Sequence, residues 1–122
     1  MNRFLSVAAG GSIGAVARYA VSLLVARFWT HEFPLATLVI NVTGCFILGF
    51  FSTLAAGRIG IDPSWRLFVS TGFVGAYTTF STFEYETSRL TEAGAMLWAT
   101  VNVLVSVVAG FLAVRIGVML AR

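Results

Sequence analysis

The sequence predicts an all-α integral membrane protein with four membrane-spanning helices. Of its 122 residues, 58% are hydrophobic and only 11% are charged, and the mean hydropathy is +0.91. A water-soluble chain of this length would need a charged shell that so few charged residues do not supply. Four apolar segments are each long enough to cross a bilayer, which takes about 20 helical residues. They are residues 4–27, 35–56, 65–89 and 95–120. We therefore expect a single four-helix transmembrane domain over residues 1–122.

The charged side chains and the cysteine limit the possible partners. The formal net charge is +3, and the basic residues are arginines that stand singly between apolar runs. Nucleic acid is therefore not expected as a partner, because the arginines form no patch. The single cysteine, Cys45, allows neither an intrachain disulfide nor a thiolate metal site, and we interpret it as a small buried hydrophobic residue. His31 is interpreted as a solvated or interfacial side chain of a loop.

The first segment contains one charged side chain within its apolar run, Arg18. A guanidinium inside such a span costs a few kcal/mol, so it usually faces protein or water. Arg18 shares a helical face with Gly11 and Gly14, and two interpretations remain open: it extends to the nearer interface, or it lines a vestibule that attracts anions. Because Arg18 interrupts the apolar run, a retained helix is favoured over a cleaved signal peptide. Gly10 and Gly14 form a GxxxG pair, which allows close helix packing.

Asparagines occur within the second and fourth segments. Asn41 lies in the middle of the second segment, where its amide must find partners. Its N–H groups suit an anion, and hydrogen bonding between helices is the alternative. In the fourth segment, Asn102, Ser106 and Gly110 share one helical stripe, which we interpret as polar lining.

The third segment contains an unusual concentration of glycines and hydroxyl side chains, in residues 72–86. Gly72 and Gly75 are followed by Thr78 and Thr79, and this composition weakens helix propensity over two turns. A break is therefore predicted here, which divides the segment into two half-helices and leaves backbone carbonyls without helical partners. Carbonyls of this kind at membrane depth bind cations.

Two phenylalanines follow the predicted break. Phe80 and Phe83 are three residues apart, so their rings lie on one helical face. The hydroxyl groups of Ser81 and Thr82 stand between them in the sequence. The edge of an aromatic ring is electropositive, and hydroxyl groups donate hydrogen bonds. The group suits a small anion that would otherwise keep its water, and ordinary packing is the alternative role of the phenylalanines.

The string Gly-Ala-Tyr-Thr-Thr-Phe-Ser-Thr-Phe at residues 75–83 resembles the third-helix signature of the Fluc (CrcB) fluoride channels. The Val-Ile-Asn-Val-Thr-Gly string around Asn41 and the Gly-x-x-x-Arg string ending at Arg18 are similar to that family's second and first helices. Ala76 and Glu84 depart from the family pattern, in which a second glycine and a small residue are usual. The resemblance implies a passive, fluoride-selective channel that exports cytoplasmic fluoride and so reduces its toxicity.

The resemblance also implies an assembly and a set of site residues. Two chains would form an antiparallel, dual-topology homodimer in the inner membrane of a prokaryote, with two fluoride pathways. A structural sodium ion at the dimer centre would be held by the backbone carbonyls of Gly75 and Thr78. Arg18 and Glu86 would lie at a vestibule or pore mouth. The expected fluoride pathway comprises Asn41, Phe80, Ser81, Thr82, Phe83 and Ser106.

The distribution of arginines permits an antiparallel pair. With four spans, both termini lie on one side of the membrane, and that side carries five arginines against three on the other. The five are Arg3, Arg58, Arg66, Arg115 and Arg122, and the three are Arg18, Arg27 and Arg89. Because arginine bias sets topology, so small an excess permits insertion both ways. Insertion both ways supplies antiparallel pairs of identical chains.

A small dual-topology, proton-coupled drug or cation antiporter is the alternative function. That mechanism needs a membrane-embedded carboxylate, and the spans offer only Glu84 and Glu86. Both lie near the end of the third segment, where exposure or a pore mouth explains them. A scaffold subunit without transport would leave the asparagine, arginine and phenylalanines within the spans unexplained. An enzyme is not expected, because the sequence contains no recognisable nucleophile–base pair or metal-ligand cluster.

Overall fold

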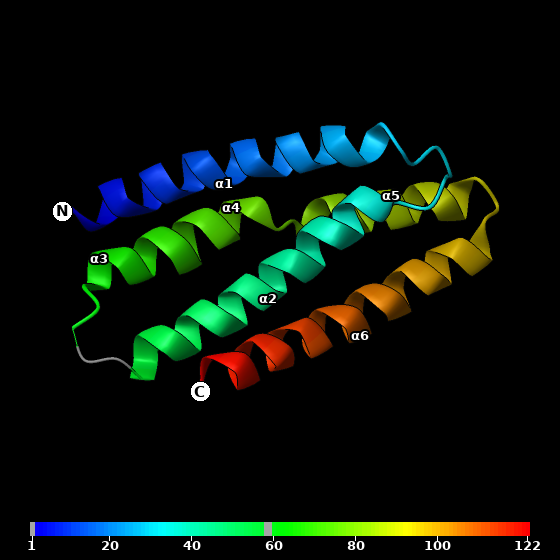
Figure 1. The fold of residues 1–122 in the computed structure, drawn as a ribbon. Coiled ribbons are helices and arrows are strands. Elements are labelled where there is room, and N and C mark those ends of the chain that lie inside the picture. The colour runs from blue at the N-terminus through cyan, green and yellow to red at the C-terminus, as the bar shows by residue number, and fades with distance from the viewer. Residues whose placement is uncertain (1, 58–59) are drawn as a thin grey trace.

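The computed structural model describes residues 2–57 and 60–122, and its regular elements in these ranges are all helical. The helices lie side by side in an elongated bundle, with both chain ends near the same end of it (Figure 1). The chain runs along the bundle four times, and its third passage is bent. The predicted fold class, an all-helical membrane protein with four helices and a broken third one, is confirmed. Arg58, one of the arginines counted for orientation, lies outside the described residues.

Three continuous helices correspond to the first, second and fourth predicted segments. They are α1 (Arg3–Ala26), α2 (Leu35–Gly57) and α6 (Met96–Ala121). Each is long and apolar enough to cross a membrane. Their bounds agree with the predicted ones to within one residue. At the start of α1, the side-chain oxygen of Asn2 accepts a hydrogen bond from the Phe4 N–H at 2.8 Å and so caps the helix.

The third predicted segment is divided into several elements. They are α3 (Pro63–Arg66), η1 (Leu67–Val74), α4 (Gly75–Tyr77) and, after two extended residues, α5 (Phe80–Glu92). The predicted break is confirmed, but the segment is longer at both ends than residues 65–89. At its start, Asp62 accepts a hydrogen bond from the Ser64 N–H at 2.7 Å, which also lowers the pKa of Asp62. Pro63 takes the first helical position, so Asp-Pro is a helix start signal that a search for apolar residues overlooks.

The element η1 is a π-helix, which the sequence does not predict. Such helices are rare and are found mostly as short stretches, frequently at functional sites. η1 packs so closely on α1 that a Cβ atom at Gly10 would overlap the carbonyl oxygen of Phe68. A Cβ atom at Gly14 would likewise overlap the carbonyl oxygen of Phe73. The two glycines therefore allow close helix packing, as the GxxxG spacing predicts.

Gly10→Ala is expected to lower the free energy of unfolding by about 1–3 kcal/mol, because the added methyl group overpacks the contact between α1 and η1. Gly11→Ala is the matched control, since a Cβ atom there would lie 3.8 Å from the Gly72 carbonyl oxygen, an ordinary contact distance. Thermal unfolding of both purified variants in detergent measures the difference. Equal melting temperatures for the two variants would contradict the close packing.

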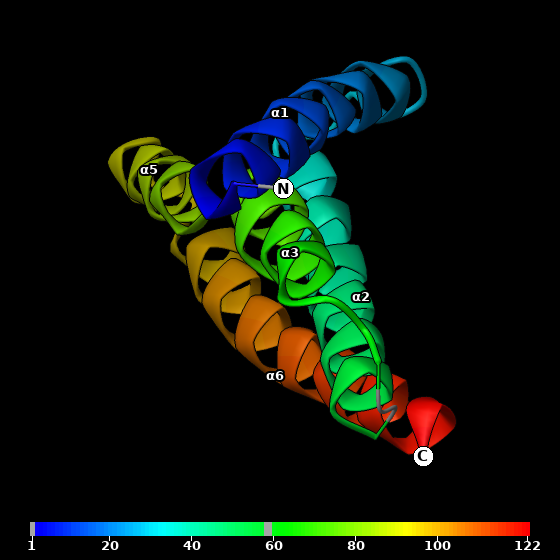
Figure 2. The ribbon, with the colours of Figure 1, turned by 90° about the vertical axis from the view of Figure 1, so that its left-hand side faces the viewer.

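The two halves of the third segment have different partners. η1 and α4 pack on α1, whereas α5 packs on α6. Viewed from the end of the bundle, α3 lies directly beside α1, whereas α5 lies to the left of both (Figure 2). α2 contacts both halves and also packs along α6. The break is therefore flanked by α2, which is the helix that carries Asn41.

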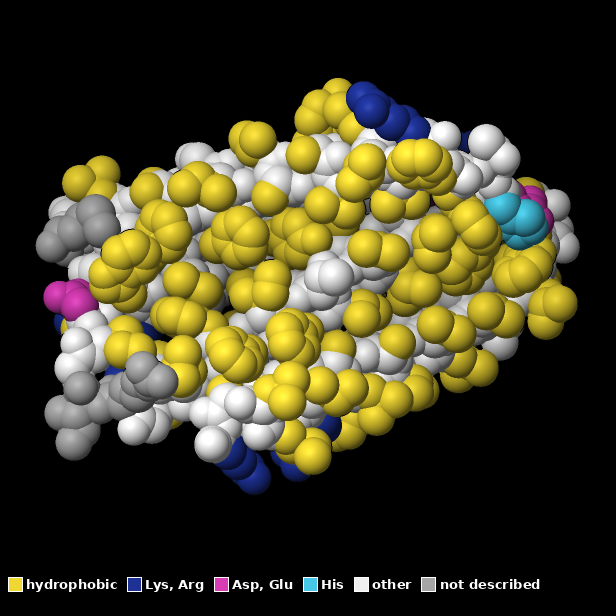
Figure 3. All heavy atoms as spheres, viewed as in Figure 1, with side chains coloured by type: hydrophobic (Ala, Val, Ile, Leu, Met, Phe, Trp, Pro, Cys, Tyr) yellow, Lys and Arg dark blue, Asp and Glu magenta, His cyan; other side chains and the backbone are white. Residues whose placement is uncertain are grey.

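The surface of the bundle is largely apolar. Hydrophobic side chains cover most of the face shown in Figure 3, and the charged side chains visible there lie at its ends and edges. Large apolar side chains are exposed along α1 and α6, among them Val16, Leu104 and Phe111. A bilayer covers such a surface favourably, whereas water does not. The chain is thus a multi-pass membrane protein.

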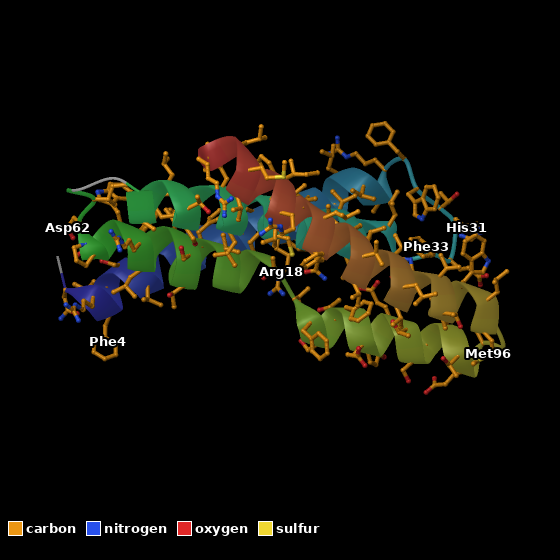
Figure 4. The ribbon with its side chains drawn as sticks, turned by 90° about the horizontal axis from the view of Figure 1, so that it is seen from below. Phe4, Arg18, His31, Phe33, Asp62 and Met96 are labelled. Carbon is orange, nitrogen blue, oxygen red and sulfur yellow. The ribbon has the colours of Figure 1, made fainter. Side chains whose placement is uncertain are left out.

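An aromatic cluster lies at the end of the bundle away from the chain termini. The Trp29 Nε1–H donates a hydrogen bond to the Phe33 carbonyl oxygen at 2.7 Å, and the Phe33 N–H donates one to His31 Nδ1 at 3.0 Å. The ring centroids of His31 and Trp98 are 4.9 Å apart in an edge-on arrangement. His31 is exposed next to Phe33 in the loop before α2 (Figure 4). Tryptophans in this position are typical of a membrane–water interface, which agrees with the interpretation of His31.

Candidate functional site

The break in the third segment consists of two residues with extended backbone. Thr78 has φ −78° and ψ 157°, and Thr79 has φ −150° and ψ 113°. The Thr79 hydroxyl accepts a hydrogen bond from the Thr82 N–H at 3.2 Å and donates one to the Thr82 hydroxyl at 3.0 Å. Thr79 is therefore the N-cap residue of α5, and it determines where the second half-helix begins.

Asn41 of α2 holds the break through two hydrogen bonds to one residue. Its side-chain oxygen accepts from the Thr79 N–H at 2.8 Å, and its Nδ2 donates to the Thr79 carbonyl oxygen at 3.1 Å. Asn41 thus supplies partners to the two peptide groups that flank the Thr79 Cα and have left the helical ladder. An amide carries two N–H donors, so one of them serves the break. Hydrogen bonding between helices is therefore one role of Asn41, and contact with an anion stays a prediction.

The same hydrogen bonds affect the carbonyl group of Gly75. In a continuous α-helix the Thr79 N–H would bond to the carbonyl four residues earlier, which is that of Gly75. Here this N–H donates to Asn41 instead. The break therefore releases the Gly75 carbonyl from its helical partner, as the glycine and threonine pattern predicts.

Tyr77 and the first residue of the break, Thr78, pack tightly against α2. A Cβ atom at Gly44 would overlap the methyl group of Thr78, so only glycine allows α2 to approach this closely. Tyr77 is buried, and its ring stacks on that of Phe73 with the centroids 5.6 Å apart. The Tyr77 hydroxyl lies 2.8 Å from the hydroxyl of Thr43 on α2. α2 therefore contacts the chain on both sides of the break.

Phe80 and Phe83 lie together, as their spacing predicts, but in different surroundings. Their ring centroids are 5.9 Å apart and their planes are inclined by 49°. Phe83 is 7% exposed, whereas Phe80 is 75% exposed. Phe80 lines a recess of about 220 Å³ together with Asn41 and Thr78. The exposed ring is therefore the one that lies beside the break.

A second recess, of about 240 Å³, brings Arg18 of α1 to the same region. Thr37, Thr79 and Thr82 line it together with Arg18. Figure 4 places Arg18 beside the gap between α4 and α5. Arg18 thus shares a recess with hydroxyl-bearing residues of the break, and its place at a vestibule stays a prediction.

The remaining hydroxyl groups predicted for the site occupy two separate places. Ser81 and Thr82 are exposed on α5, and the Ser81 hydroxyl lies 3.4 Å from that of Thr79. Ser106 lies on α6, where its hydroxyl donates to the side-chain oxygen of Asn102 at 3.3 Å. The structure therefore brings Ser81 and Thr82 to the break, while Ser106 is absent from the residues that line the two recesses there.

A buried asparagine connects the polar stripe of α6 to α5. Asn102 is 2% exposed, and its Nδ2 donates to the Thr87 hydroxyl at 2.9 Å. The Thr87 hydroxyl in turn donates to the Phe83 carbonyl oxygen at 2.8 Å. In this chain, Asn102 therefore holds α6 against α5 instead of lining an open path, which corrects the interpretation of that residue as polar lining.

Glu86 lies farther along α5, nearer the aromatic cluster. Its Oε1 accepts a hydrogen bond of 2.5 Å from the hydroxyl of Thr37, which stands 49 positions earlier in the chain. Glu86 also lines a hollow of about 480 Å³ together with Arg89 and Trp29. This hollow adjoins the loop that carries the interfacial aromatic residues, so Glu86 occupies a position suited to a pore mouth.

The site contains residues that the sequence prediction did not include, and only one of them has a local sequence signal. The capping role of Thr79 has a local signal, because a hydroxyl residue three positions before Thr82 starts a helix in many proteins. The contact between Thr43 and Tyr77 joins residues 34 positions apart, and no local pattern indicates it. The same holds for the hydrogen bond from Thr37 to Glu86.

An apolar bundle whose third helix is interrupted, with an amide, an arginine and hydroxyl groups gathered at the interruption, has the form of a membrane transport protein with a discontinuous helix. The family described as "CrcB-like protein, Camphor Resistance (CrcB)" matches residues 5–118 of the chain. The chain belongs to this family, the CrcB/FluC family of fluoride-specific ion channels.

Individual relatives match along nearly the whole chain. The chain is 45% identical over 120 residues to "Fluoride-specific ion channel FluC" of Acidobacterium capsulatum, a match that covers 98% of this chain and 96% of the relative. It is 42% identical over 122 residues to the protein of the same name from Sulfurihydrogenibium sp., covering 100% and 98% of the two chains. The protein of that name from Geobacter sp. is 43% identical over 122 residues, again with 100% and 98% coverage. These comparisons confirm the resemblance stated from the third-helix string.

Proposed function

We propose that this chain forms a fluoride-selective ion channel that exports cytoplasmic fluoride passively and so reduces its toxicity. The observation that carries the proposal is the interrupted third helix, where Asn41, Thr78 and the exposed ring of Phe80 surround one recess. The names of relatives that match nearly the whole chain support the same function.

The groups around the break are suited to a dehydrated fluoride ion. An anion that leaves water for an apolar bundle must find donors of hydrogen bonds or other electropositive groups, because burial without them is costly. The ring edges of the two phenylalanines, the hydroxyl groups and the second amide N–H of Asn41 supply such groups. The proposed pathway residues are Asn41, Phe80, Ser81, Thr82, Phe83 and Ser106. Arg18 would attract the anion into the vestibule, and Glu86 would stand at the pore mouth.

A passive pore is sufficient for export. Hydrogen fluoride crosses membranes as a neutral molecule and dissociates in the cytoplasm, which traps the ion inside. An inside-negative potential drives anions outward by ~2.3 kcal/mol per charge per 100 mV. The channel therefore needs no coupled energy source, and the sequence offers no embedded carboxylate outside the end of the third segment to provide one.

Two chains are inferred to assemble as an antiparallel, dual-topology homodimer in a prokaryotic inner membrane. Gly75 and Phe80 are exposed on the single chain beside the break, so a second copy would enclose the groups proposed to contact ions. The small arginine bias supports insertion in both orientations.

A tag on the C-terminus is therefore expected on both sides of the membrane in one preparation. The measurement is labelling of the tag in sealed vesicles by a membrane-impermeant reagent, before and after permeabilisation. Complete labelling before permeabilisation, or labelling only after it, would show a single orientation and contradict dual topology.

A sodium ion is inferred to bind at the dimer centre, held by the carbonyl oxygens of Gly75 and Thr78. Carbonyl oxygens of an unwound helix suit this cation. The fit rests on the release of the Gly75 carbonyl by the hydrogen bond from Thr79 to Asn41, and on the extended backbone of Thr78. The charge of the ion would also lower the cost of placing anions nearby.

Replacing sodium by a large organic cation is expected to slow fluoride efflux several-fold or to dissociate the dimer. Efflux from liposomes and elution volume in detergent, both measured after exhaustive exchange, report the two effects. Unchanged efflux together with an unchanged elution volume would contradict a structural sodium ion.

The test of the channel function uses purified protein in liposomes loaded with fluoride or chloride and monitored with ion-selective electrodes. Fast efflux of fluoride with little efflux of chloride is expected, without any proton gradient. Cation flux that depends on a proton gradient, in the absence of fluoride efflux, would instead support the antiporter alternative.

A further inference from the structure

We infer that Tyr77 and Thr43 form a positioning pair that orients the carbonyl groups of Gly75 and Thr78. Tyr77 stands between Gly75 and Thr78 in the sequence, and it is the last residue of α4. α4 continues η1 without a break and is the last turn of this half-helix, so its carbonyl groups lack the partners that a further turn would supply. Terminal turns fray, so side-chain contacts help to fix the direction of these carbonyl groups. The inference rests on the proposed sodium site, because it concerns the geometry of that site.

The side chain of Tyr77 is held between two elements. It is 6% exposed, and its ring stacks on Phe73 of η1 with an interplanar angle of 11°. On the other side lies α2, where Gly44 leaves room for the ring: a Cβ atom there would be 3.3 Å from Tyr77 Cδ1. The hydroxyl group reaches Thr43, one position before this glycine, at an oxygen–oxygen distance of 2.8 Å. The ring contacts fix the position of the aromatic ring, and the hydrogen bond fixes the position of the hydroxyl group.

The direction of this hydrogen bond follows from counting protons. The Thr43 hydroxyl has one hydrogen, and its oxygen lies 2.7 Å from the Val39 carbonyl oxygen and 3.1 Å from that of Ile40. Carbonyl oxygens only accept, so the Thr43 hydrogen must point toward them. The Tyr77 hydroxyl is then the donor and the Thr43 oxygen the acceptor. Tyr77 is buried, and a buried hydroxyl donor needs a partner, which the Thr43 oxygen supplies.

The Tyr77–Thr43 pair and Asn41 together hold the chain on both sides of Thr78. Asn41 fixes the peptide groups of Thr79 from α2, and Thr43 fixes Tyr77 from the same helix. Thr78 therefore has anchored neighbours on both sides. Loss of the Tyr77 anchor would allow the last turn of α4 to rotate, and the carbonyls of Gly75 and Thr78 would then no longer point in a fixed direction.

The test is the dependence of fluoride efflux on sodium concentration for Tyr77→Phe, Thr43→Val and the double variant. Each protein is equilibrated at a series of sodium concentrations, with a large organic cation as the balance, before efflux begins. Both single variants are expected to raise the sodium concentration for half-maximal efflux about tenfold, while efflux at saturating sodium stays within about twofold of the unaltered protein. The double variant is expected to match the single ones, because they remove the same bond. Thr43→Ser keeps the acceptor and is expected to keep the original midpoint.

Several results would overturn the inference. Unchanged midpoints, efflux lowered equally at all sodium concentrations, or effects that multiply in the double variant would show that the pair only packs. A Thr43→Ser midpoint shifted as far as that of Thr43→Val would show that the hydroxyl is not what matters. If Tyr77→Phe fails to elute as the unaltered protein does, Thr43→Val decides the question, because it preserves shape. Absence of any sodium dependence in the unaltered protein would overturn the cation site itself, and with it this inference.

Discussion

Phe83→Ile is expected to lower fluoride efflux from liposomes at least tenfold, equivalent to ~1.4 kcal/mol of barrier, while the protein keeps its normal elution volume. Isoleucine keeps the side chain apolar and moderately bulky but removes the electropositive ring edge. Phe83 is 7% exposed, so its substitution also perturbs packing, and the stability of the variant must be measured beside its efflux.

Phe80→Ile separates the loss of the ring edge from the loss of packing. Phe80 is 75% exposed in the single chain, so little packing within the chain is lost when its ring is removed. We expect efflux to fall to a similar degree as for Phe83→Ile. Phe111→Ile is the matched control, because Phe111 is also an exposed phenylalanine of a membrane-spanning helix but lies on α6. Near-normal efflux from a well-folded Phe83→Ile protein would show that Phe83 does not contact the ion. The same outcome for Phe80→Ile would show this for the exposed ring.

Asn41→Asp is expected to have the largest effect, a loss of fluoride efflux of at least a hundredfold, or ~2.7 kcal/mol of barrier. The aspartate oxygen that replaces Nδ2 cannot donate to the Thr79 carbonyl oxygen, so two acceptors would face each other across the break. The other carboxylate oxygen could still accept from the Thr79 N–H, but repulsion by the Thr79 carbonyl oxygen would push the carboxylate away from the break, and a negative charge would stand in the proposed anion path. Asn41→Ala removes both hydrogen bonds without adding charge. Its fluoride efflux is expected to lie between that of Asn41→Asp and that of the unaltered protein.

Val42→Ala serves as the control for this pair of variants. Val42 is the neighbouring half-buried residue of α2, and its truncation changes packing without touching the break. Efflux and elution volume are measured for all three variants. A well-folded Asn41→Ala protein with efflux like that of Val42→Ala would contradict the central role of Asn41.

Most of the fold could be predicted from the sequence, because bilayer thickness and apolar composition determine the positions of membrane helices. The break in the third segment was predictable as well, since Gly75 and Thr78 lower helix propensity at membrane depth. The π-helix of η1 was not, because glycines and threonines indicate a weak helix without indicating which hydrogen-bonding pattern replaces it. The backbone of η1 contacts Gly10 and Gly14, and this contact is formed only in the tertiary structure.

The candidate site was predictable in its composition but not in its connections. Helical spacing correctly placed Phe80 beside Phe83, but spacing does not say that one ring is buried and the other exposed. The need of Asn41 for partners followed from its position in an apolar helix, but its partner, the peptide groups of Thr79, lies 38 positions away. Asn102 has the same residue type and also lies in an apolar helix, yet its partner is the Thr87 hydroxyl of α5 and not the break, because the packing of α6 decides its neighbours.

The π-helical segment makes chain length as important as side-chain identity in the third membrane passage. Hydrogen bonds in a π-helix join residues five apart instead of four, so η1 accommodates a residue that an α-helix would not. Deletion of one residue between positions 67 and 74 would therefore allow an ordinary α-helix that keeps the following residues in register, whereas insertion of one residue would turn everything after it by one helical position. Tyr77 would then face away from α2, and the break would lose its alignment with Asn41. Insertion of one residue in this stretch should therefore be tolerated far less than deletion of one, although both change the length of the passage.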